Sequence, residues 1–115
     1  MNVDEYIVSK GYKEFEPTSF DNSSVIKCFQ KRFDDKIGKK YFITIKKWDW
    51  TWINDMHKSH MPPYSYEFII QLYQKGTHAP ININFFSGWN LDDVEEYIEK
   101  IWNLNIFDYY EEWNE

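Results

Sequence analysis

The chain has 115 residues, of which 43% are hydrophobic and 28% are charged, and its formal net charge is −6. This composition excludes a disordered chain, and the length fits one folded domain, 1–115, with a core of its own. Cys28 is the only cysteine, which excludes an internal disulfide and favours a reducing, cytoplasmic location. Because no apolar run is long enough for a secretory leader or a membrane span, we expect neither.

The first predicted element is a short helix. Asn2 is a good helix cap, and Glu5 stands three positions later, as a capping box requires. Gly11 is a typical residue at a helix end, because glycine accepts the left-handed conformation found there. Residues 12–24, which include Pro17 and the polar run 21–24, predict a connection without regular structure.

Four strands are predicted next, from the alternation of apolar and polar residues. The first two cover 25–33 and 40–50, and the turn between them contains Gly38, so they form a hairpin. Residues 51–63 predict a longer loop that ends in two prolines. The third strand covers 64–75 and shows the clearest period of two. A turn over 76–80 and a fourth strand from Ile81 follow, and Ser87 and Gly88 end that strand.

A second helix closes the pattern. Asn90 is its predicted cap, and acidic residues follow at once, where the positive end of the helix dipole favours them. Its apolar stripe consists of Leu91, Val94, Ile98, Ile101 and Trp102. We therefore predict an α+β domain in which a four-stranded antiparallel meander has one face covered by an N-terminal and a C-terminal helix. The expected sheet core beneath the stripe is Ile43, Phe68, Ile70 and Ile83.

Charge is distributed unevenly along the chain. Residues 89–115 hold nine acids and one base, a formal charge of −8, so the preceding residues must sum to +2. Residues 27–47 hold eight bases and two acids. An acidic excess beyond the needs of helix capping predicts a surface for a basic protein or nucleoprotein partner. Its expected residues are Glu95, Glu96, Glu99, Tyr109, Glu111, Glu112 and Trp113.

The string Trp48-Asp49-Trp50-Thr51-Trp52 offers a second candidate surface. If the strand continues through it, all three rings lie on one face, because side chains alternate along a strand. An exposed stripe of three tryptophans would mark a protein interface. The alternative is that the chain bends and the rings fold over one edge of the core.

The basic hairpin predicts an alternative function, which is binding of single-stranded nucleic acid. Lysines and rings alternate on both strands, and their expected residues are Lys27, Phe29, Lys31, Phe42 and Lys46. If the two rows share one exposed face, bases could stack on the rings while lysines pair with phosphates. The competing interpretation is that the phenylalanines are core and the lysines protect an edge. The single arginine weakens the nucleic-acid reading.

Other classes of chemistry have little support in the sequence. His57 and His60 are three positions apart, but no set of four zinc ligands accompanies them, so we expect no metal. The phosphate-loop and hydrolase motifs are absent, so we expect no cofactor and no enzyme activity. Abundant Ile, Lys, Asn, Tyr and Phe indicate AT-rich codons, as in some bacteria and phages. We therefore expect a small binding protein such as an inhibitor or immunity protein, encoded by a bacterium, phage or mobile element.

Overall fold

The computed structural model describes residues 1–34, 40–57, 62–72 and 81–103. Their helices and strands are, in chain order, α1 (Val3–Ser9), β1 (Lys13–Phe15), β2 (Val25–Asp34), β3 (Lys40–Asp49), α2 (Thr51–His57), β4 (Tyr64–Leu72), β5 (Ile81–Gly88) and α3 (Leu91–Asn103). The strands form one antiparallel sheet in the order β1-β2-β3-β4-β5, so each strand pairs with its neighbour in the sequence. The α+β class and the antiparallel sheet predicted from the sequence are confirmed.

The sheet has five strands, so the predicted number of four is wrong. The additional strand is β1, which lies within the segment expected to be a plain connection. Its three residues pair with Cys28, Phe29 and Gln30 of β2. All three β1 side chains are exposed, so no hydrophobic alternation distinguishes the strand in the sequence. Backbone pairing with β2 defines it instead.

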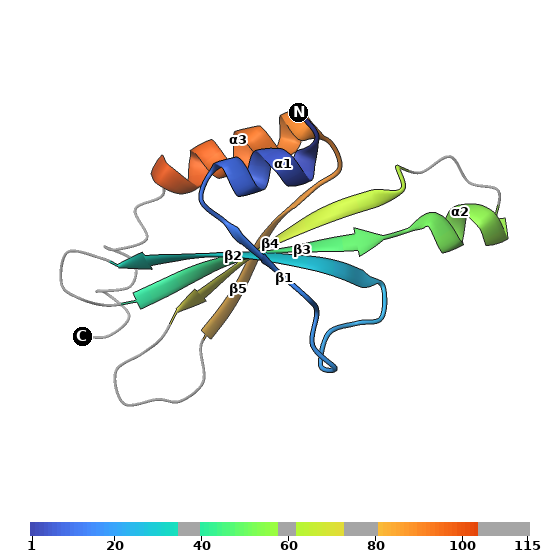
Figure 1. Cartoon of the computed structure of the whole chain (residues 1–115), viewed down its shortest axis with the longest axis horizontal. Coiled ribbons are helices and arrows are strands. Elements are labelled where there is room, and N and C mark those ends of the chain that lie inside the picture. Colours follow the sequence, from blue (N-terminus) through green and yellow to red (C-terminus); the bar gives the residue numbers. More distant parts are fainter. Residues whose placement is uncertain (35–39, 58–61, 73–80, 104–115) are drawn as a thin grey trace.

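A second correction concerns the segment after β3, which was expected to be a loop over 51–63. It begins with α2, a helix of seven residues. Asp49 precedes this helix, and its Oδ1 accepts hydrogen bonds from the Thr51 backbone N at 2.9 Å and the Thr51 Oγ1 at 2.6 Å. A carboxylate that bonds the backbone two residues later starts a turn. In Figure 1, α2 extends beyond the end of β3, away from α1 and α3.

The first helix follows its sequence signals closely. The Asn2 Oδ1 accepts from the Glu5 backbone N at 2.8 Å, and the Glu5 carboxylate accepts in return from the Asn2 backbone N at 3.4 Å. This is the predicted capping box. Beyond the helix, Gly11 has a φ of +91°, which a side chain would strain, and there the chain turns from α1 into β1. Both end signals of α1 are confirmed.

The core lies between the sheet and the layer formed by α1 and α3, which we call the helical layer. The two helices lie side by side over the same face of the sheet (Figure 1). Ile7 of α1 and Val94 and Ile98 of α3 are almost fully buried there. They belong to one cluster with the sheet residues Phe29, Ile43, Ile45, Tyr66, Phe68 and Ile70. Of the predicted sheet core and stripe, Ile43, Phe68, Ile70, Val94 and Ile98 are in this cluster, whereas Leu91 is only partly buried and is not in it. The side chains of Ile83, Ile101 and Trp102 lie outside the described part.

Asp4, in the first turn of α1, joins the helical layer to three strands. Its Oδ2 accepts hydrogen bonds from Lys27 Nζ of β2 at 3.1 Å and from Lys47 Nζ of β3 at 3.0 Å. Its Oδ1 accepts from the Tyr66 hydroxyl of β4 at 2.8 Å. Burial by itself would raise the pKa of Asp4, but the hydrogen bonds from Lys47, Tyr66 and Lys27 outweigh burial and lower it. We call these four residues the Asp4 cluster.

Both hairpins predicted from the sequence are present. The pairing of Asp34 with Lys40 shows that β2 and β3 form the predicted hairpin, and the pairing of Leu72 with Ile81 shows the same for β4 and β5. The connections themselves, 35–39 and 73–80, lie outside the described residues, as does 104–115. Among the described residues, no helix is long and apolar enough to cross a membrane.

The packing of α3 can be tested at Ile98, whose side chain is 2% exposed. Ile98→Ala should lower the free energy of unfolding by about 2–5 kcal/mol, because it removes buried methylene groups and leaves a cavity. The matched control is Ile26→Ala, since Ile26 is 39% exposed and should cost less than about 1 kcal/mol. Urea unfolding of both variants measures the difference. Equal losses would show that α3 does not cover the core.

The Asp4 cluster predicts a pH dependence of stability. Because the pKa of Asp4 is lowered on folding, its contribution is present above the ordinary value of 3.8 and is lost as pH falls through the lower, folded value. Asp4→Asn should cost about 1–3 kcal/mol near neutral pH, and this cost should shrink below about pH 4. Urea unfolding from pH 2 to 7 tests it, with exposed Asp55→Asn as control. A cost that is the same at every pH would contradict the role given to the ionised carboxylate.

Candidate functional site

The acidic residues of α3 have two roles. Some cap the helix, and others form a surface that faces away from the core. The Asn90 Oδ1 accepts from the Asp93 backbone N at 2.9 Å, and the Asp93 Oδ2 accepts from the Trp89 backbone N at 3.1 Å. Asn90 is thus the helix cap, as predicted. Val94 and Ile98 point into the core. Since side chains three and four residues apart share one side of a helix, Glu96 and Glu99 are directed away from the core and are exposed.

Only one base accompanies these acids on α3. Lys100 Nζ lies 2.7 Å from the Glu96 Oε1, one helical turn apart, and this contact raises the pKa of Lys100. Both side chains are more than half exposed, so the pair contributes little to stability. Among the described residues, no cation lies within ion-pair distance of Asp92 or Glu95. The outer side of α3 therefore carries a net negative charge.

The neighbouring helix adds an aromatic ring to this surface. Tyr6 of α1 has its pKa raised by partial burial and by the negative charges of Glu95 and Glu99 on α3. Its ring also has Lys10 Nζ at 5.4 Å from the ring centroid. A ring beside two carboxylates is a suitable environment for a cation. The sequence does not indicate this arrangement, because the proximity of α1 to α3 is a tertiary contact with no local signal.

The remaining predicted members of the acidic surface lie outside the described residues. They are Tyr109, Glu111, Glu112 and Trp113. Their place relative to α3 stays a prediction.

The three tryptophans do not form one stripe, because the strand on which that prediction depended ends at Asp49 and α2 begins at Thr51. Trp48 and Trp50 stack, with ring centroids 5.4 Å apart and planes 4° apart. The Trp50 Nε1 donates a hydrogen bond to the Ser65 Oγ at 2.8 Å. Trp52 stands apart on α2 and is 46% exposed. The spacing of Asp49 and Thr51 is the local signal that could have predicted the break.

The basic hairpin does not present the predicted row of lysines and rings. Register pairs Phe29 with Ile45 and Arg32 with Phe42, so Lys27, Phe29 and Lys31 face the helical layer. Phe42 and Lys46 lie on the opposite, helix-free face. Phe29 is fully buried in the core, where a base cannot stack on it. The alternative nucleic-acid site, as the sequence suggested it, is therefore divided between two faces.

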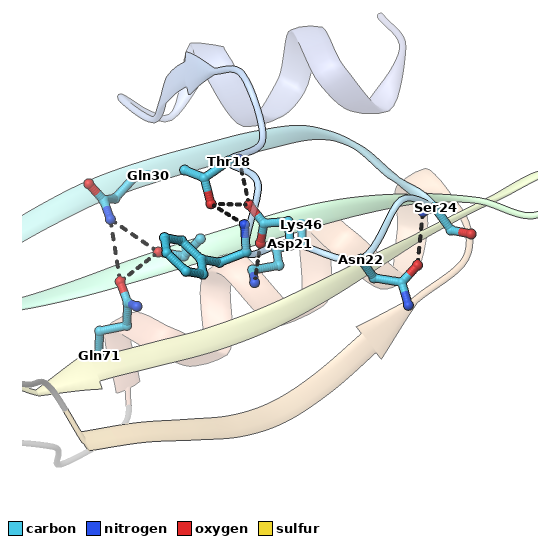
Figure 2. Close-up of polar contacts among 9 residues, drawn as sticks. Thr18, Asp21, Asn22, Ser24, Gln30, Lys46 and Gln71 are labelled. Carbon is cyan, nitrogen blue, oxygen red and sulfur yellow. Dashed lines mark hydrogen bonds and ion pairs between the residues drawn. The ribbon is translucent and has the colours of Figure 1, made fainter.

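The lysines of the hairpin also have partners within the chain. Lys27 Nζ lies 3.1 Å from Asp4 and 3.5 Å from Glu14. Lys31 Nζ donates to the Lys10 carbonyl oxygen at 2.8 Å. On the helix-free face, Lys46 Nζ lies 2.7 Å from the Asp21 Oδ1, and this contact lowers the pKa of Asp21 (Figure 2). Of the bases of 27–47 whose side chains the structure describes, Lys27, Lys46 and Lys47 are thus ion-paired within the chain.

The helix-free face has a polar centre, shown in Figure 2. The Gln30 Nε2 donates to the Thr44 Oγ1 at 3.2 Å and to the Gln71 Oε1 at 3.4 Å, and the Thr44 Oγ1 donates to the same Gln71 oxygen at 3.1 Å. These residues come from β2, β3 and β4 and form a hydrogen-bonded row across the sheet. Thr44 is 4% exposed even though no described helix covers this face.

The part of the chain that the structure describes offers little that could serve catalysis or hold a metal. Cys28 is buried, and burial raises its pKa to about 11, as expected for a packed thiol. Among the described residues, no group of three histidine, cysteine or acidic side chains could hold a metal ion. The His57 side chain and the whole of His60 lie outside that part of the chain, so the sequence prediction for this pair stays open.

That prediction has a direct test. Purified protein should contain far less than one equivalent of zinc or copper, because His57 and His60 lack the further ligands that these ions require. Elemental analysis of the protein after gel filtration measures the content. A content near one equivalent that disappears in the His57→Ala/His60→Ala variant would establish a metal site.

Comparison with protein-family models, with curated proteins and with solved structures found no match for this chain. Its function must therefore be inferred from its own geometry and charges. Two surfaces of the domain are candidates for a functional site. One is the acidic outer side of the helical layer, and the other is the helix-free face of the sheet.

Proposed function

We propose that this chain is a small, non-enzymatic protein-binding module that engages a basic protein or nucleoprotein through the acidic outer side of its helical layer. An inhibitor or an immunity-like protein would act in this way. The observation that carries the proposal is a difference in how charge is neutralised. Lys27, Lys46 and Lys47 on the sheet are ion-paired within the chain. On α3, by contrast, Asp92 and Glu95 have no cation within ion-pair distance in the described part of the chain, and the base of that helix, Lys100, pairs with Glu96.

The spatial arrangement supports a surface of net negative charge. Glu96 and Glu99 point away from the core, and Glu95 lies toward Tyr6 of α1. Keeping several like charges on one face costs self-repulsion, which a basic partner would relieve. A lysine or arginine from that partner could also contact the Tyr6 ring, where Lys10 already lies in the free protein. Tyr109, Glu111, Glu112 and Trp113 belong to the proposed surface on sequence grounds alone.

The tryptophans are not expected to form the main contact with the partner. Trp52 is exposed on α2, but α2 lies away from the helical layer (Figure 1). Trp48 and Trp50 are partly buried in their stacked pair. A partner that contacts α3 would need a second, separate area of contact to reach Trp52. We therefore place the main contact on the helical layer.

The proposal predicts a rate effect. The Glu95→Gln/Glu96→Gln/Glu99→Gln variant should associate with its partner at least about tenfold more slowly at low salt, because electrostatic steering is lost. The partner is obtained by affinity capture from the source cell and then purified, and stopped-flow fluorescence measures the association rate at two salt concentrations. The difference between variant and parent should shrink at high salt.

The matched control removes three negative charges elsewhere, in Glu14→Gln/Glu16→Gln/Asp55→Asn, where all three residues are exposed. This variant has the same net charge as the α3 variant, so it separates local steering from the effect of total charge. Equal rates for the two variants would contradict the acidic-surface proposal. A loss of binding in Trp52→Ala alone would place the interface on α2.

A further inference from the structure

We propose that a shallow basic depression where β1 meets β2, on the helix-free face, binds single-stranded nucleic acid. It is lined by Lys13, Phe15, Gln30 and Arg32, which share that face, and also by Gly11, Glu14 and Lys31. The set differs from the one suggested by the basic hairpin, because β1 supplies half of it. This inference does not depend on the acidic surface of the helical layer.

Strand pairing brings the four residues to one face. Lys13 lies opposite Gln30, and Phe15 lies opposite Cys28. Alternate residues of a strand share a face, so Lys13 and Phe15 of β1 lie on the same face as Gln30 and Arg32 of β2. In the sequence, Lys13 and Phe15 are far from Arg32, and only the unpredicted strand β1 joins them.

Each of these residues offers a group that nucleic acid can use. Lys13 and Arg32 are exposed cations suited to phosphate. The Phe15 ring is 38% exposed, which leaves area for a base to stack. Gln30 is held in place by its hydrogen bonds to Thr44 and Gln71 (Figure 2). Both of those bonds use its Nε2, so its carbonyl oxygen is available to accept a hydrogen bond from a base edge.

The charge distribution determines which partner fits. On the helix-free face the depression presents two cations, Lys13 and Arg32, whereas the acids of α3 lie in the helical layer on the opposite side of the sheet. A phosphate that approaches the depression from this face meets Lys13 and Arg32. Nearby, Asp21 is paired with Lys46, and Glu16 adds a negative charge near Cys28. The total charge of −6 opposes a polyanion at long range, so we expect weak binding, with a micromolar dissociation constant at 50 mM salt. A single strand fits better than a duplex, because only unpaired bases can stack on Phe15.

The test uses the full chain and a fluorescein-labelled ten-nucleotide oligothymidine, with fluorescence anisotropy as the readout. If two phosphates are contacted, affinity should fall by about sevenfold between 50 and 200 mM salt. Lys13→Glu/Arg32→Glu should weaken binding by about tenfold or more. Phe15→Ala should weaken it by about fivefold or more through lost stacking. Circular dichroism checks that each variant is folded.

The matched control is Lys10→Glu/Lys100→Glu, which changes the total charge by the same amount on the helical layer. It should bind oligothymidine within about twofold of the parent, because it leaves the depression unchanged. Equal weakening in both charge-reversal variants would overturn the proposal, as would the absence of binding at 50 mM salt. A heparin fragment that competes fully, together with an unaffected Phe15→Ala variant, would also overturn it and indicate a general polyanion patch.

Discussion

The carboxylate of Asp4 is the interaction on which the arrangement of the layers depends. One side chain in the first turn of α1 accepts hydrogen bonds from Lys27, Lys47 and Tyr66, which belong to three successive strands. The two lysines lie on the face that the helices cover, where an unpaired ammonium group would be costly. Asp4 forms ion pairs with both lysines at the border of the apolar cluster, so that the helix can close over Phe29, Ile45 and Phe68. Asp4 also positions α1, because its three hydrogen-bond donors determine where the helix begins on the sheet.

Local signals in the sequence predicted much of this fold. The capping box of Asn2, the stop at Gly11 and the cap at Asn90 each depend on a few adjacent residues, and each is present. The alternation along β3 and β4 likewise identified Ile43, Phe68 and Ile70 as core.

Features that depend on tertiary contacts were missed or misread. The strand β1 buries none of its three side chains, so it has no pattern of its own. The faces of the hairpin depend on register, which composition does not reveal, so Phe29 and Phe42 were assigned to one possible surface although the sheet separates them.

The candidate surfaces show the same division. The outward direction of Glu96 and Glu99 follows from the periodicity of α3, so the acidic surface could be foreseen from the sequence. The nearness of Tyr6 and the joining of Lys13 to Arg32 could not be foreseen, because they arise from packing of distant segments. The fold also gives the basic residues of 27–47 a different role from the one that the sequence suggested. Lys27, Lys46 and Lys47 serve mainly to hold segments together, and the basic depression depends more on Lys13 and Arg32. The acidic surface of α3 and the proposed basic depression thus lie on opposite sides of the sheet.

The pairing of α1 with α3 has a consequence for how the chain folds during synthesis. The strands follow one another as a meander, so each can pair soon after it leaves the ribosome. The helical layer is completed later, because α1 precedes the strands in the sequence and α3 follows them. Until residues 91–103 emerge, the part of the apolar face that Val94 and Ile98 later cover has no partner within the chain. At an elongation rate of about 5–20 residues per second, the nascent sheet waits for seconds with part of its core open to water and to chaperones.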